Sequence, residues 1–350
     1  MKNEPLVSVL IPCYNVEPYI EECLISIINQ TQRNLEIVCI DDCSGDRTWS
    51  VLKFYQLKDQ RIKLFKNKVN LGVTQTRNKL LDLASGEFVV KMDADDVALP
   101  ERIEELLKAQ KMTTADIVSS DYKIIDSRGK IIKKRGFDLL FSQAAIKFVS
   151  LFNSPLPHAP SMFKVQSLKE LKYDMNYVAA EDYHFLTQLL LRPDIRCKVV
   201  DKPLYLYRQN FAGMSFTNNE IQIKNHIKIA REAIRKVLDI EDTEHFDFWN
   251  IQKRNYDFRR ASREKIRASF QQIVFMYQRF IFKVKVTETE NNEIKFYLGQ
   301  YLFLTYYSAV KLGIQQKQTG KVLSIVFLEM IKNYRYLLTW KIIRWTLKNL

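Results

Sequence analysis

Cysteine is scarce in this sequence, and its few cysteines form no pattern. Five occur among 350 residues, an odd number without paired spacing, which predicts free thiols and a reducing compartment rather than a disulfide framework. Cys39 and Cys43 are four residues apart, but no matching pair of histidines or cysteines follows them. We therefore expect no zinc site.

Long apolar runs are also missing. The best candidate for a membrane-spanning segment, Phe296–Ile314, is interrupted by Gln300 and Lys311 and falls short of a continuous span of about 18 apolar residues. Met1–Pro5 leads directly into a strand-like run, without the basic and apolar regions of a signal peptide. We therefore expect a cytosolic chain whose contact with a membrane is peripheral.

Several common functional motifs are absent. No G-x-G-x-x-G follows the first predicted strand, and neither G-x-x-x-x-G-K-[ST] nor G-x-S-x-G occurs. These absences argue against dinucleotide-binding enzymes, P-loop NTPases and hydrolases with a nucleophile elbow.

A basic excess is present, and it is unevenly distributed. The formal net charge is +14, yet residues 1–216 hold 30 Lys and Arg against 27 Asp and Glu, whereas residues 217–350 hold 24 against 13. The second part is also rich in aromatic residues and lacks proline. We therefore predict a catalytic domain over residues 1–216 and a basic helical region over residues 217–350, which meet different partners.

The first part alternates between strand-like and helical patterns. Strands are predicted at Leu6–Pro12, Leu35–Asp41, Ile62–Phe65 and Glu87–Met92, and helices at Tyr19–Gln30, Thr48–Leu57 and Val73–Ala84, the last ended by Ser85-Gly86. Further strands are predicted at Ile117–Ser120, Ile131–Lys133, Ser161–Phe163 and Leu204–Arg208, with helices near Ser142–Phe152 and after Glu181-Asp182. Such alternation predicts an α/β fold with a mostly parallel sheet, covered by helices on both faces.

Polar clusters follow three of the predicted strands, where ligands bind in such sheets. Asp93-Ala94-Asp95-Asp96 has two carboxylates one residue apart, a pattern that suits Mg²⁺ or Mn²⁺ bridged to a substrate phosphate. The alternative is a solvated acidic turn. Asp41-Asp42 can accept from a base or a ribose, while Asp46 is expected to cap the next helix.

Each of the remaining candidate site residues has both a functional and a structural interpretation. Glu181-Asp182 can supply a general base for transfer to a hydroxyl, or can be ordinary acids at a helix start. Arg77 can pair with a diphosphate, although an exposed helical arginine is the commoner case. His158 lies in a Pro-bounded loop and can touch an acceptor, although a lone histidine is more often structural.

Five motifs occur in one order along the chain: Val7–Asn15, Ile40–Asp46, Asn70–Gly72, Asp93–Asp96 and Ala180–Asp182. This ordered set resembles glycosyltransferase family 2. The resemblance implies the GT-A fold, a mixed sheet with helices on both faces, followed here by a helical C-terminal region. The similarity is greatest to bacterial members that build lipopolysaccharide and capsule. Asn29–Thr31, Arg33–Leu35 and Glu181–Tyr183 are also similar to the lipooligosaccharide N-acetylglucosaminyltransferases.

The resemblance implies a donor site. Pro12, Tyr14 and Asp42 would hold the nucleotide base, expected to be uracil, and Arg77 would lie near the nucleotide. Asn15, Asn70 and Ala94 would belong to the same nucleotide-sugar site. Asp93 would face the ribose, and Asp95 would bind the Mn²⁺ or Mg²⁺ that bridges the diphosphate.

The resemblance also implies an inverting single displacement. Asp182 would be the catalytic base, with Glu181 beside it and His158 near the acceptor. The donor would be a UDP-sugar such as UDP-GlcNAc, UDP-GalNAc, UDP-Gal or UDP-Glc, and the acceptor a glycan or a lipid-linked glycan.

Two positions depart from the family pattern. Cys43 replaces the usual small residue after the second aspartate and could narrow the base pocket. Gln209 and Asn210 follow Arg208 where many members place a metal-binding histidine, which puts a third protein ligand in doubt.

The C-terminal segment Tyr336–Leu350 carries Lys341, Arg344 and Lys348 at helical spacing, with tryptophans and apolar residues around the rest. This pattern predicts a helix lying in the headgroup region of anionic lipid on the inner face of the cell membrane. Gly320–Ile331 and Phe296–Val310 add further apolar helix. The alternative is that these helices pack on the catalytic domain or on a second subunit. No nucleic-acid-binding module is recognisable, so nucleic acid is not an expected partner.

The leading interpretation is therefore a metal-dependent glycosyltransferase. A rival from another class is a non-catalytic nucleotide-sugar-binding or scaffold protein on the same fold. Both Asp95 and Asp182 are present, which favours catalysis. A nucleotidyltransferase is a weaker alternative, because its Gly-rich, Arg-containing loop after the first strand is missing.

Overall fold

The computed structural model describes residues 4–134, 141–209, 219–241, 243, 248–252 and 256–337. The chain divides into two compact units. The first contains Met1–Phe141 and Ser154–Asn225, and the second contains Ser142–Asn153 and His226–Leu350. The sequence placed residues 142–153 with the N-terminal part, whereas here they group with the C-terminal helices. The predicted boundary at residues 216 and 217 lies outside the described residues.

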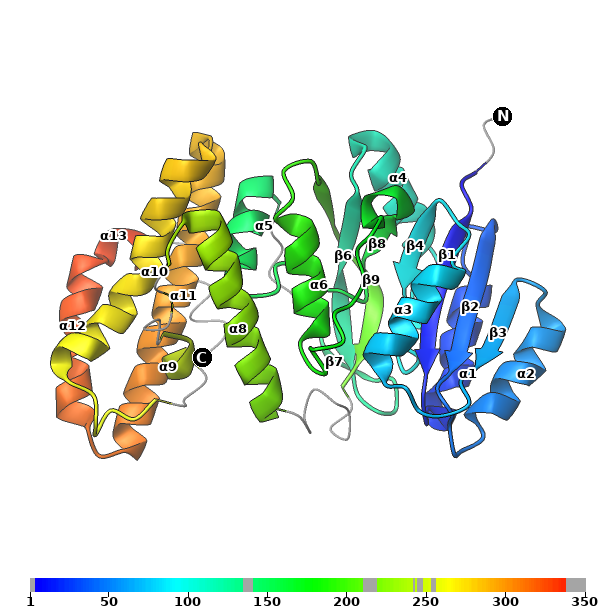
Figure 1. The fold of residues 1–350 in the computed structure, drawn as a ribbon, viewed down its shortest axis with the longest axis horizontal. Coiled ribbons are helices and arrows are strands. Elements are labelled where there is room, and N and C mark those ends of the chain that lie inside the picture. Colours follow the sequence, from blue (N-terminus) through cyan, green and yellow to red (C-terminus); the bar gives the residue numbers. More distant parts are fainter. Residues whose placement is uncertain are drawn as a thin grey trace. The chain divides into compact units, whose positions relative to one another are not determined.

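The first unit is built on one nine-stranded sheet (Figure 1). Its order is β3-β2-β1-β4-β8-β6-β9-β5, with β7 paired to β6. The strands are β1 (Val7–Cys13), β2 (Leu35–Asp41), β3 (Ile62–Lys66), β4 (Phe88–Lys91), β5 (Val97–Ala98), β6 (Ile117–Ile125), β7 (Ile131–Lys133), β8 (Met162–Lys164) and β9 (Cys197–Arg208).

The register of the sheet brings the predicted site segments to one edge. β1 lies between β2 and β4 and is parallel to both, with Val7 opposite Leu35 and Phe88. The carboxyl ends of these three strands therefore open at the same edge, where the polar clusters follow. Beyond β4, β8 is antiparallel, and β6 and β9 run parallel to each other. The sheet is mixed, as the GT-A resemblance implied.

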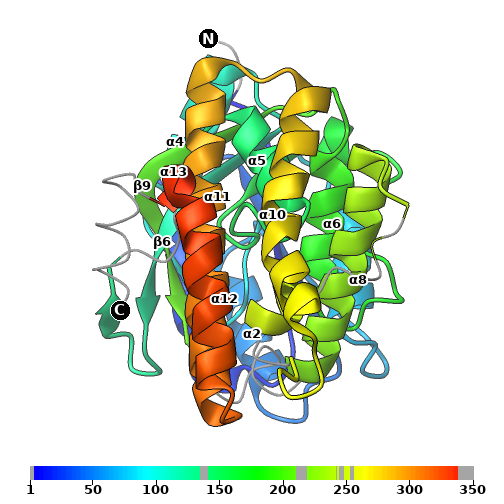
Figure 2. The ribbon, with the colours of Figure 1, turned by 90° about the vertical axis from the view of Figure 1, so that its left-hand side faces the viewer.

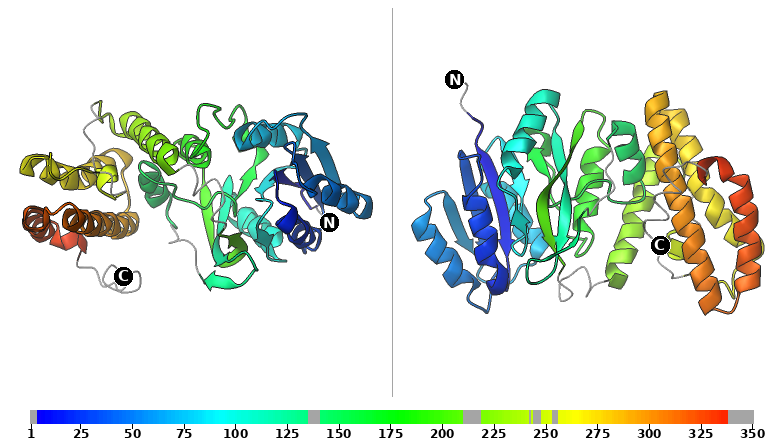
Figure 3. Two further views of the ribbon diagram at one scale, coloured as in Figure 1. Left: turned by 90° about the horizontal axis from the view of Figure 1, so that it is seen from below. Right: turned by 180° about the vertical axis from the view of Figure 1, so that it is seen from behind.

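Helices cover both faces of this sheet. The helices of the unit are α1 (Glu17–Ile28), α2 (Thr48–Lys58), α3 (Val73–Leu83), α4 (Arg102–Thr113), α6 (Glu181–Leu190) and the 3₁₀ turn η1 (Val165–Leu168). α3 lies in front of the sheet in Figure 1, whereas the dark blue α1 lies in front when the molecule is seen from behind (Figure 3, right). The prediction of helices on both faces is confirmed.

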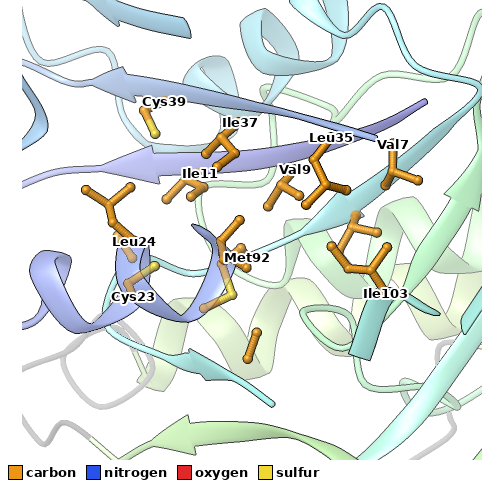
Figure 4. Packing of buried hydrophobic residues seen from close by; sticks show 14 of the residues in the cluster. Val7, Val9, Ile11, Cys23, Leu24, Leu35, Ile37, Cys39, Met92 and Ile103 are labelled. Carbon is orange, nitrogen blue, oxygen red and sulfur yellow. The ribbon is translucent and has the colours of Figure 1, made fainter. Parts of the chain in front are cut away.

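Alternation along the strands explains the core. Val7, Val9 and Ile11 of β1 point to one face and pack with apolar residues of α1 and α4, including Leu24 and Ile103 (Figure 4). All five are buried. A strand with apolar residues on both faces must be covered twice, which is why the strand and helix patterns alternate in this sequence.

Gly86 has a different role from the one expected. α3 already ends at Leu83, and the capping residue Ala84 has an extended backbone, so Gly86 does not end the helix. A Cβ at Gly86 would lie 2.7 Å from the carbonyl oxygen of Leu6 and 2.8 Å from the backbone nitrogen of Ser8. Glycine is needed here because β1 passes too close for a side chain.

The second unit is helical. Its elements are α5 (Gln143–Ser150), α8 (Asn219–Leu238, which begins in the first unit), α9 (Phe248–Gln252), α10 (Arg263–Val284), α11 (Glu288–Gln315), α12 (Thr319–Lys332) and α13 (Tyr334–Leu337). Thr287 and Glu290 form a capping box that starts the long α11. Among the helices of the described ranges, none has the length and apolar character needed to cross a bilayer.

Two sequence predictions have different outcomes. The five cysteines are free, which confirms the expected absence of disulfides. Lys341, Arg344 and Lys348 of the predicted interfacial helix lie outside the described residues, so that helix stays a prediction.

Candidate active site

The loops after β1 and β2 are tied together. The backbone N–H of Asn15 donates to the Ser44 hydroxyl at 3.0 Å, and the Asn15 side-chain oxygen accepts from the Gly45 N–H at 2.8 Å. Asn15 and Cys43 both have positive φ, at 49° and 63°, and these cross-links hold them there. Tyr14 remains exposed beside the two loops. Two predicted base-contacting segments therefore form one fixed surface.

Asp42 anchors a third loop to this surface. Its carboxylate accepts from the Asn67 side chain at 2.7 Å and from the N–H groups of Leu71 and Gly72, both at 2.9 Å. Asn70 adds a local bond to the Gly72 N–H, also at 2.9 Å. Oδ1 of Asp42 accepts two of these bonds but Oδ2 accepts one, which leaves Oδ2 able to accept another N–H.

The acidic segment after β4 contains two very different carboxylates. Asp96 is buried, and it accepts from the Tyr205 hydroxyl at 2.7 Å and from the Arg208 N–H at 2.6 Å. The carboxylate of Asp95 accepts no hydrogen bond from a side chain of the described residues. Burial and the charge of Asp93 raise the pKa of Asp95 to about 6. Burial, with the charges of Asp95 and Asp93, raises the pKa of Asp96 well above its usual value.

The donor set at this position fits a hard divalent cation. Asp93 and Asp95 offer carboxylate oxygens that repel each other. Arg77 pairs with Asp93, whereas the carboxylate of Asp95 has no hydrogen-bonded lysine or arginine among the described residues. No cluster of three histidine, cysteine, aspartate or glutamate residues that could hold a metal occurs among the described residues. A cation here would therefore need oxygen ligands from a bound substrate, as diphosphates supply.

Arg208 secures the backbone beneath Asp95, a role that the sequence did not suggest. Its Nε donates to the Asp95 carbonyl at 2.7 Å, and one terminal nitrogen donates to Glu22 at 2.5 Å. The other terminal nitrogen of Arg208 donates to the carbonyls of Asp126 and Ser127 at 3.1 and 3.3 Å. The sequence drew attention to the missing histidine after Arg208, but Arg208 itself is the buried residue that reaches the acidic segment.

Arg77 connects the acidic segment to α6. Its guanidinium pairs with Glu181 and donates to Asp93 at 3.2 Å. Burial lowers the pKa of Arg77, but the charges of Glu181 and Asp93 outweigh it, so the pKa is raised and Arg77 stays charged. The expectation of an exposed helical arginine is wrong: Arg77 is buried, because its two partners lie far away in sequence and face inward.

The start of α6 is held in an unusual conformation. Ala180, the residue before Glu181, has a left-handed backbone with φ 64°, which is uncommon outside glycine and asparagine. The preceding loop is fixed to α3, because Asn78 exchanges two 2.8 Å hydrogen bonds with the backbone of Tyr173. Asp182 is only partly buried. One of its carboxylate oxygens accepts a hydrogen bond from the backbone N–H of Tyr183, the next residue of the helix. Its second oxygen remains available.

A second group of buried polar residues lies under the site. His158 is buried and shares a 2.8 Å hydrogen bond with the Tyr173 hydroxyl. Burial, with the charges of Lys91 and Arg77, lowers the pKa of His158 well below its usual value. His158 is therefore neutral and packed among rings, which favours the structural interpretation over contact with an acceptor. The Lys91 ammonium lies 5.1 Å from the centre of the Tyr173 ring. Sequence analysis did not identify Lys91, although a lone lysine in an apolar strand was a signal that could have.

The structure thus brings together residues from six segments of the chain. Arg77 contacts both Asp93 and Glu181, and Asp42 organises the loop that contains Asn70. Pro12 lies at the end of β1, and Tyr14 and Asn15 follow the strand at the same edge of the sheet. Ala94 is buried between the two acidic residues.

Comparison with known proteins identifies the family. The model of glycosyl transferase family 2 matches residues 8–171. The uncharacterized glycosyltransferase MJ1057 of Methanocaldococcus jannaschii is 34% identical over 59% of this chain and 71% of its own length. The chain belongs to glycosyl transferase family 2. The same chain is also similar to WcaA, an Escherichia coli protein named for colanic acid biosynthesis. The two are 25% identical over 66% of this chain and 82% of WcaA.

Solved structures share the fold. TarS of S. aureus in complex with UDP-GlcNAc has a TM-score of 0.56 and 19% identity, covering 93% of the glycosyltransferase and 91% of that chain. The mannosyltransferase PcManGT of Pyrobaculum calidifontis, in complex with GDP-Man and Mn²⁺, has a TM-score of 0.50 and 16% identity over 95% and 88%. At these identities the likeness extends to the fold alone.

Proposed function

We propose that this family 2 enzyme is an inverting, metal-dependent glycosyltransferase. It transfers a sugar from a UDP-sugar to a hydroxyl group of a glycan or lipid-linked acceptor during synthesis of a surface polysaccharide. The observation that carries the proposal is the bridge made by Arg77. One guanidinium joins Asp93, on the expected donor side, to Glu181, next to the expected base.

The donor would lie along the strand ends. Tyr14 offers an exposed ring beside the fixed loops after β1 and β2, and the free lone pair on Asp42 Oδ2 can accept the N3–H of uracil. The complex of the similarly folded TarS with UDP-GlcNAc supports a uridine nucleotide as the first candidate.

Asp95, with Asp93 beside it, would hold Mn²⁺ or Mg²⁺ against the donor diphosphate. Such a cation neutralises the negative charge that develops on the departing nucleoside diphosphate. Arg208 keeps the backbone of Asp95 in place through its 2.7 Å bond to the carbonyl oxygen. Within the described ranges no side chain donates a hydrogen bond to the carboxylate of Asp95, which supports this assignment.

Asp182 would act as the general base. It takes the proton of the acceptor hydroxyl as that oxygen attacks the anomeric carbon from the face opposite the diphosphate. The new C–O bond forms as the bond between the anomeric carbon and the diphosphate oxygen breaks, so the configuration inverts and the nucleoside diphosphate leaves. Arg77 holds Glu181 and thereby the first turn of α6, in which Asp182 is the next residue.

Two further observations support the proposed pathway and site of action. The related protein WcaA is named for colanic acid biosynthesis, which supports a surface polysaccharide as product. Residues 217–350 carry most of the basic excess, which supports peripheral attachment of a cytoplasmic enzyme to the anionic inner face of the cell membrane.

A donor panel tests the proposal. Purified enzyme is mixed with UDP-, GDP- and CMP-sugars, each with Mn²⁺ and with EDTA, and thermal stability and donor hydrolysis are measured. We expect one or more UDP-sugars to raise the melting temperature with Mn²⁺ but not with EDTA, and to be hydrolysed slowly. Absence of any donor-dependent shift would favour the scaffold alternative, and a shift that survives EDTA would contradict the role of Asp95.

A further inference from the structure

The helix α12 has an apolar face that no described residue covers. Leu323, Phe327 and Ile331 are 45%, 65% and 54% exposed, and Tyr334 at the start of α13 is 60% exposed. These positions follow one another at intervals of four, four and three residues, so they form a single stripe along the helix. The opposite side of α12 is buried, with Val322, Ile325 and Val326 in the core of the second unit.

This exposed stripe takes no part in the packing among the described helices of the unit. α12 packs with its buried side on α10 and α11, and it lies on the outside of them in Figure 2. Single exposed apolar residues are normal on protein surfaces, but an aligned row of large ones marks an interaction site. The row therefore calls for a partner with an apolar surface.

The charges beside the stripe indicate the nature of that partner. Lys332 and Arg335 are exposed on the same stretch, and Arg263 of α10 reaches the hydroxyl of Ser324 at 3.2 Å. The one acidic residue of α12 and α13, Glu329, is fully buried and pairs with Arg267 at 3.3 Å and Lys332 at 3.6 Å. The stretch thus presents apolar side chains bordered by positive charge, without an exposed acid of its own.

We infer that α12 and the start of α13 are the surface through which the enzyme docks on an anionic lipid bilayer. Aromatic and aliphatic side chains in a row, with lysine and arginine at the border, match a helix that lies in the headgroup region. The inference rests on the peripheral attachment proposed above and gives it a defined face. The sequence-based expectation placed attachment in the C-terminal helices, with the basic stripe in Tyr336–Leu350; the inference assigns it to α12 and the start of α13.

Vesicle sedimentation with full-length protein tests the inference. Wild-type enzyme is incubated with phosphatidylglycerol-containing vesicles and with pure phosphatidylcholine vesicles. We expect binding to the anionic vesicles, weakening with salt, and little binding to the neutral ones. Phe327→Ser combined with Ile331→Ser should reduce anionic-vesicle binding by about tenfold, because two apolar side chains no longer enter the bilayer.

Two further variants serve as controls. Phe54→Ser combined with Leu57→Ser removes exposed apolar residues of the first unit and should leave vesicle binding unchanged. Lys341→Gln, Arg344→Gln and Lys348→Gln together remove charge from the C-terminal segment. A loss of binding in this triple variant alone, with the α12 variant behaving as wild type, would overturn the inference.

A second copy of the chain is the competing occupant. Sedimentation velocity without vesicles would reveal it: self-association that the α12 variant abolishes would overturn lipid docking in favour of a dimer interface. Hydrolysis of UDP-sugars in solution is measured in parallel and should be the same in all variants. Failure of hydrolysis in the wild type would count against the proposed function, whereas failure of vesicle binding would count against the docking face.

Discussion

Two carboxylates at opposite edges of the sheet behave in opposite ways. Glu36, near the amino end of β2, accepts hydrogen bonds from Lys63 at 2.5 Å, from the backbone and hydroxyl of Ser85, both at 2.6 Å, and from the Ser8 hydroxyl. Burial would raise its pKa, but these donors outweigh burial and lower the pKa to about 2. Asp95, beyond the carboxyl end of β4, has a pKa raised to about 6 by burial and by Asp93.

The difference separates structural from functional acids. A fully bonded carboxylate such as Glu36 stabilises the folded chain and has little capacity left for a ligand. A carboxylate held close to another, without a hydrogen-bonding partner, costs stability unless a ligand compensates it. Asp95 and the available oxygen of Asp182 are of the second kind. We therefore expect changes at the carboxyl edge to affect activity, and changes at Glu36 to affect stability.

The largest effect is expected for Asp182→Asn. Loss of the base should reduce sugar transfer by about 10³-fold, because the amide cannot take the acceptor proton, while the donor-induced thermal shift stays nearly that of wild type. Transfer is measured with the donor found in the panel. Asp194→Asn, at an exposed acid after α6, is the matched control and should leave transfer unchanged. Wild-type transfer by the Asp182 variant would remove that residue as the base.

A smaller effect is expected for Arg208→Lys. Lysine keeps the charge but cannot contact Asp95, Glu22 and Asp126 together, so the backbone at Asp95 should become less well positioned. We expect the apparent affinity for Mn²⁺ to fall about tenfold, measured by manganese titration of donor binding, with the unfolding temperature followed in the same samples.

Glu22→Gln provides the milder version of this test. It weakens one bond of Arg208 at a half-exposed acid and leaves the guanidinium in place. We expect the affinity for Mn²⁺ to fall less than in Arg208→Lys and in the same direction. Unchanged affinity in both variants would show that Asp95 is positioned without Arg208.

The smallest effect on catalysis is expected for Glu36→Gln. The folded pKa of about 2 lies below the ordinary value of 4.5, so the ionised form stabilises the fold, fully above about pH 4.5 and progressively less toward pH 2. The variant should lose about 2 kcal/mol of unfolding free energy near neutral pH, and the difference from wild type should shrink in acid. Urea unfolding of both proteins, near neutral pH and in acid, measures this difference in unfolding free energy.

Glu87→Gln is the control at the same edge of the sheet, where the side chain is exposed. It should match wild type in stability at both pH values. A loss of transfer activity in Glu36→Gln at a temperature where the variant remains folded would contradict the division between structural and functional acids.

The sequence predicted the elements that have strong apolar patterns and missed those that do not. β1, β2, β3 and β4 were found within one or two residues. β1, β2 and β4 are buried runs, and β3 has apolar residues at Ile62, Leu64 and Phe65 although most of it is exposed. β9 extends from Cys197, but only its end at Leu204–Arg208 was predicted. Asp201-Lys202-Pro203 interrupts the apolar pattern, and the pairing with β6 shifts register at Asp121, opposite Pro203. The two residues of β5 are too few to form a pattern.

The site was predicted as a set of residue types but not as a network. Asp46 was expected to be the N-cap of α2, but that position is Arg47. The Asp46 carboxylate accepts from the backbone N–H of Thr48 at 3.0 Å and from that of Glu17 at the start of α1. The burial of Arg77 could not be predicted, because it depends on Glu181, 104 residues away. Motif spacing identifies residues that follow strands, whereas ion pairs between distant segments become visible only in three dimensions.

The most direct test of the account is the metal dependence of donor binding at Asp95. UDP is titrated into wild-type enzyme and into Asp95→Asn by calorimetry, each with Mn²⁺ and with EDTA. We predict that Mn²⁺ strengthens binding to the wild type and has no effect on the variant, while the two proteins bind UDP equally weakly in EDTA. An equal strengthening by Mn²⁺ in both proteins would contradict the assignment of Asp95 as the metal-binding residue and, with it, the proposed mechanism.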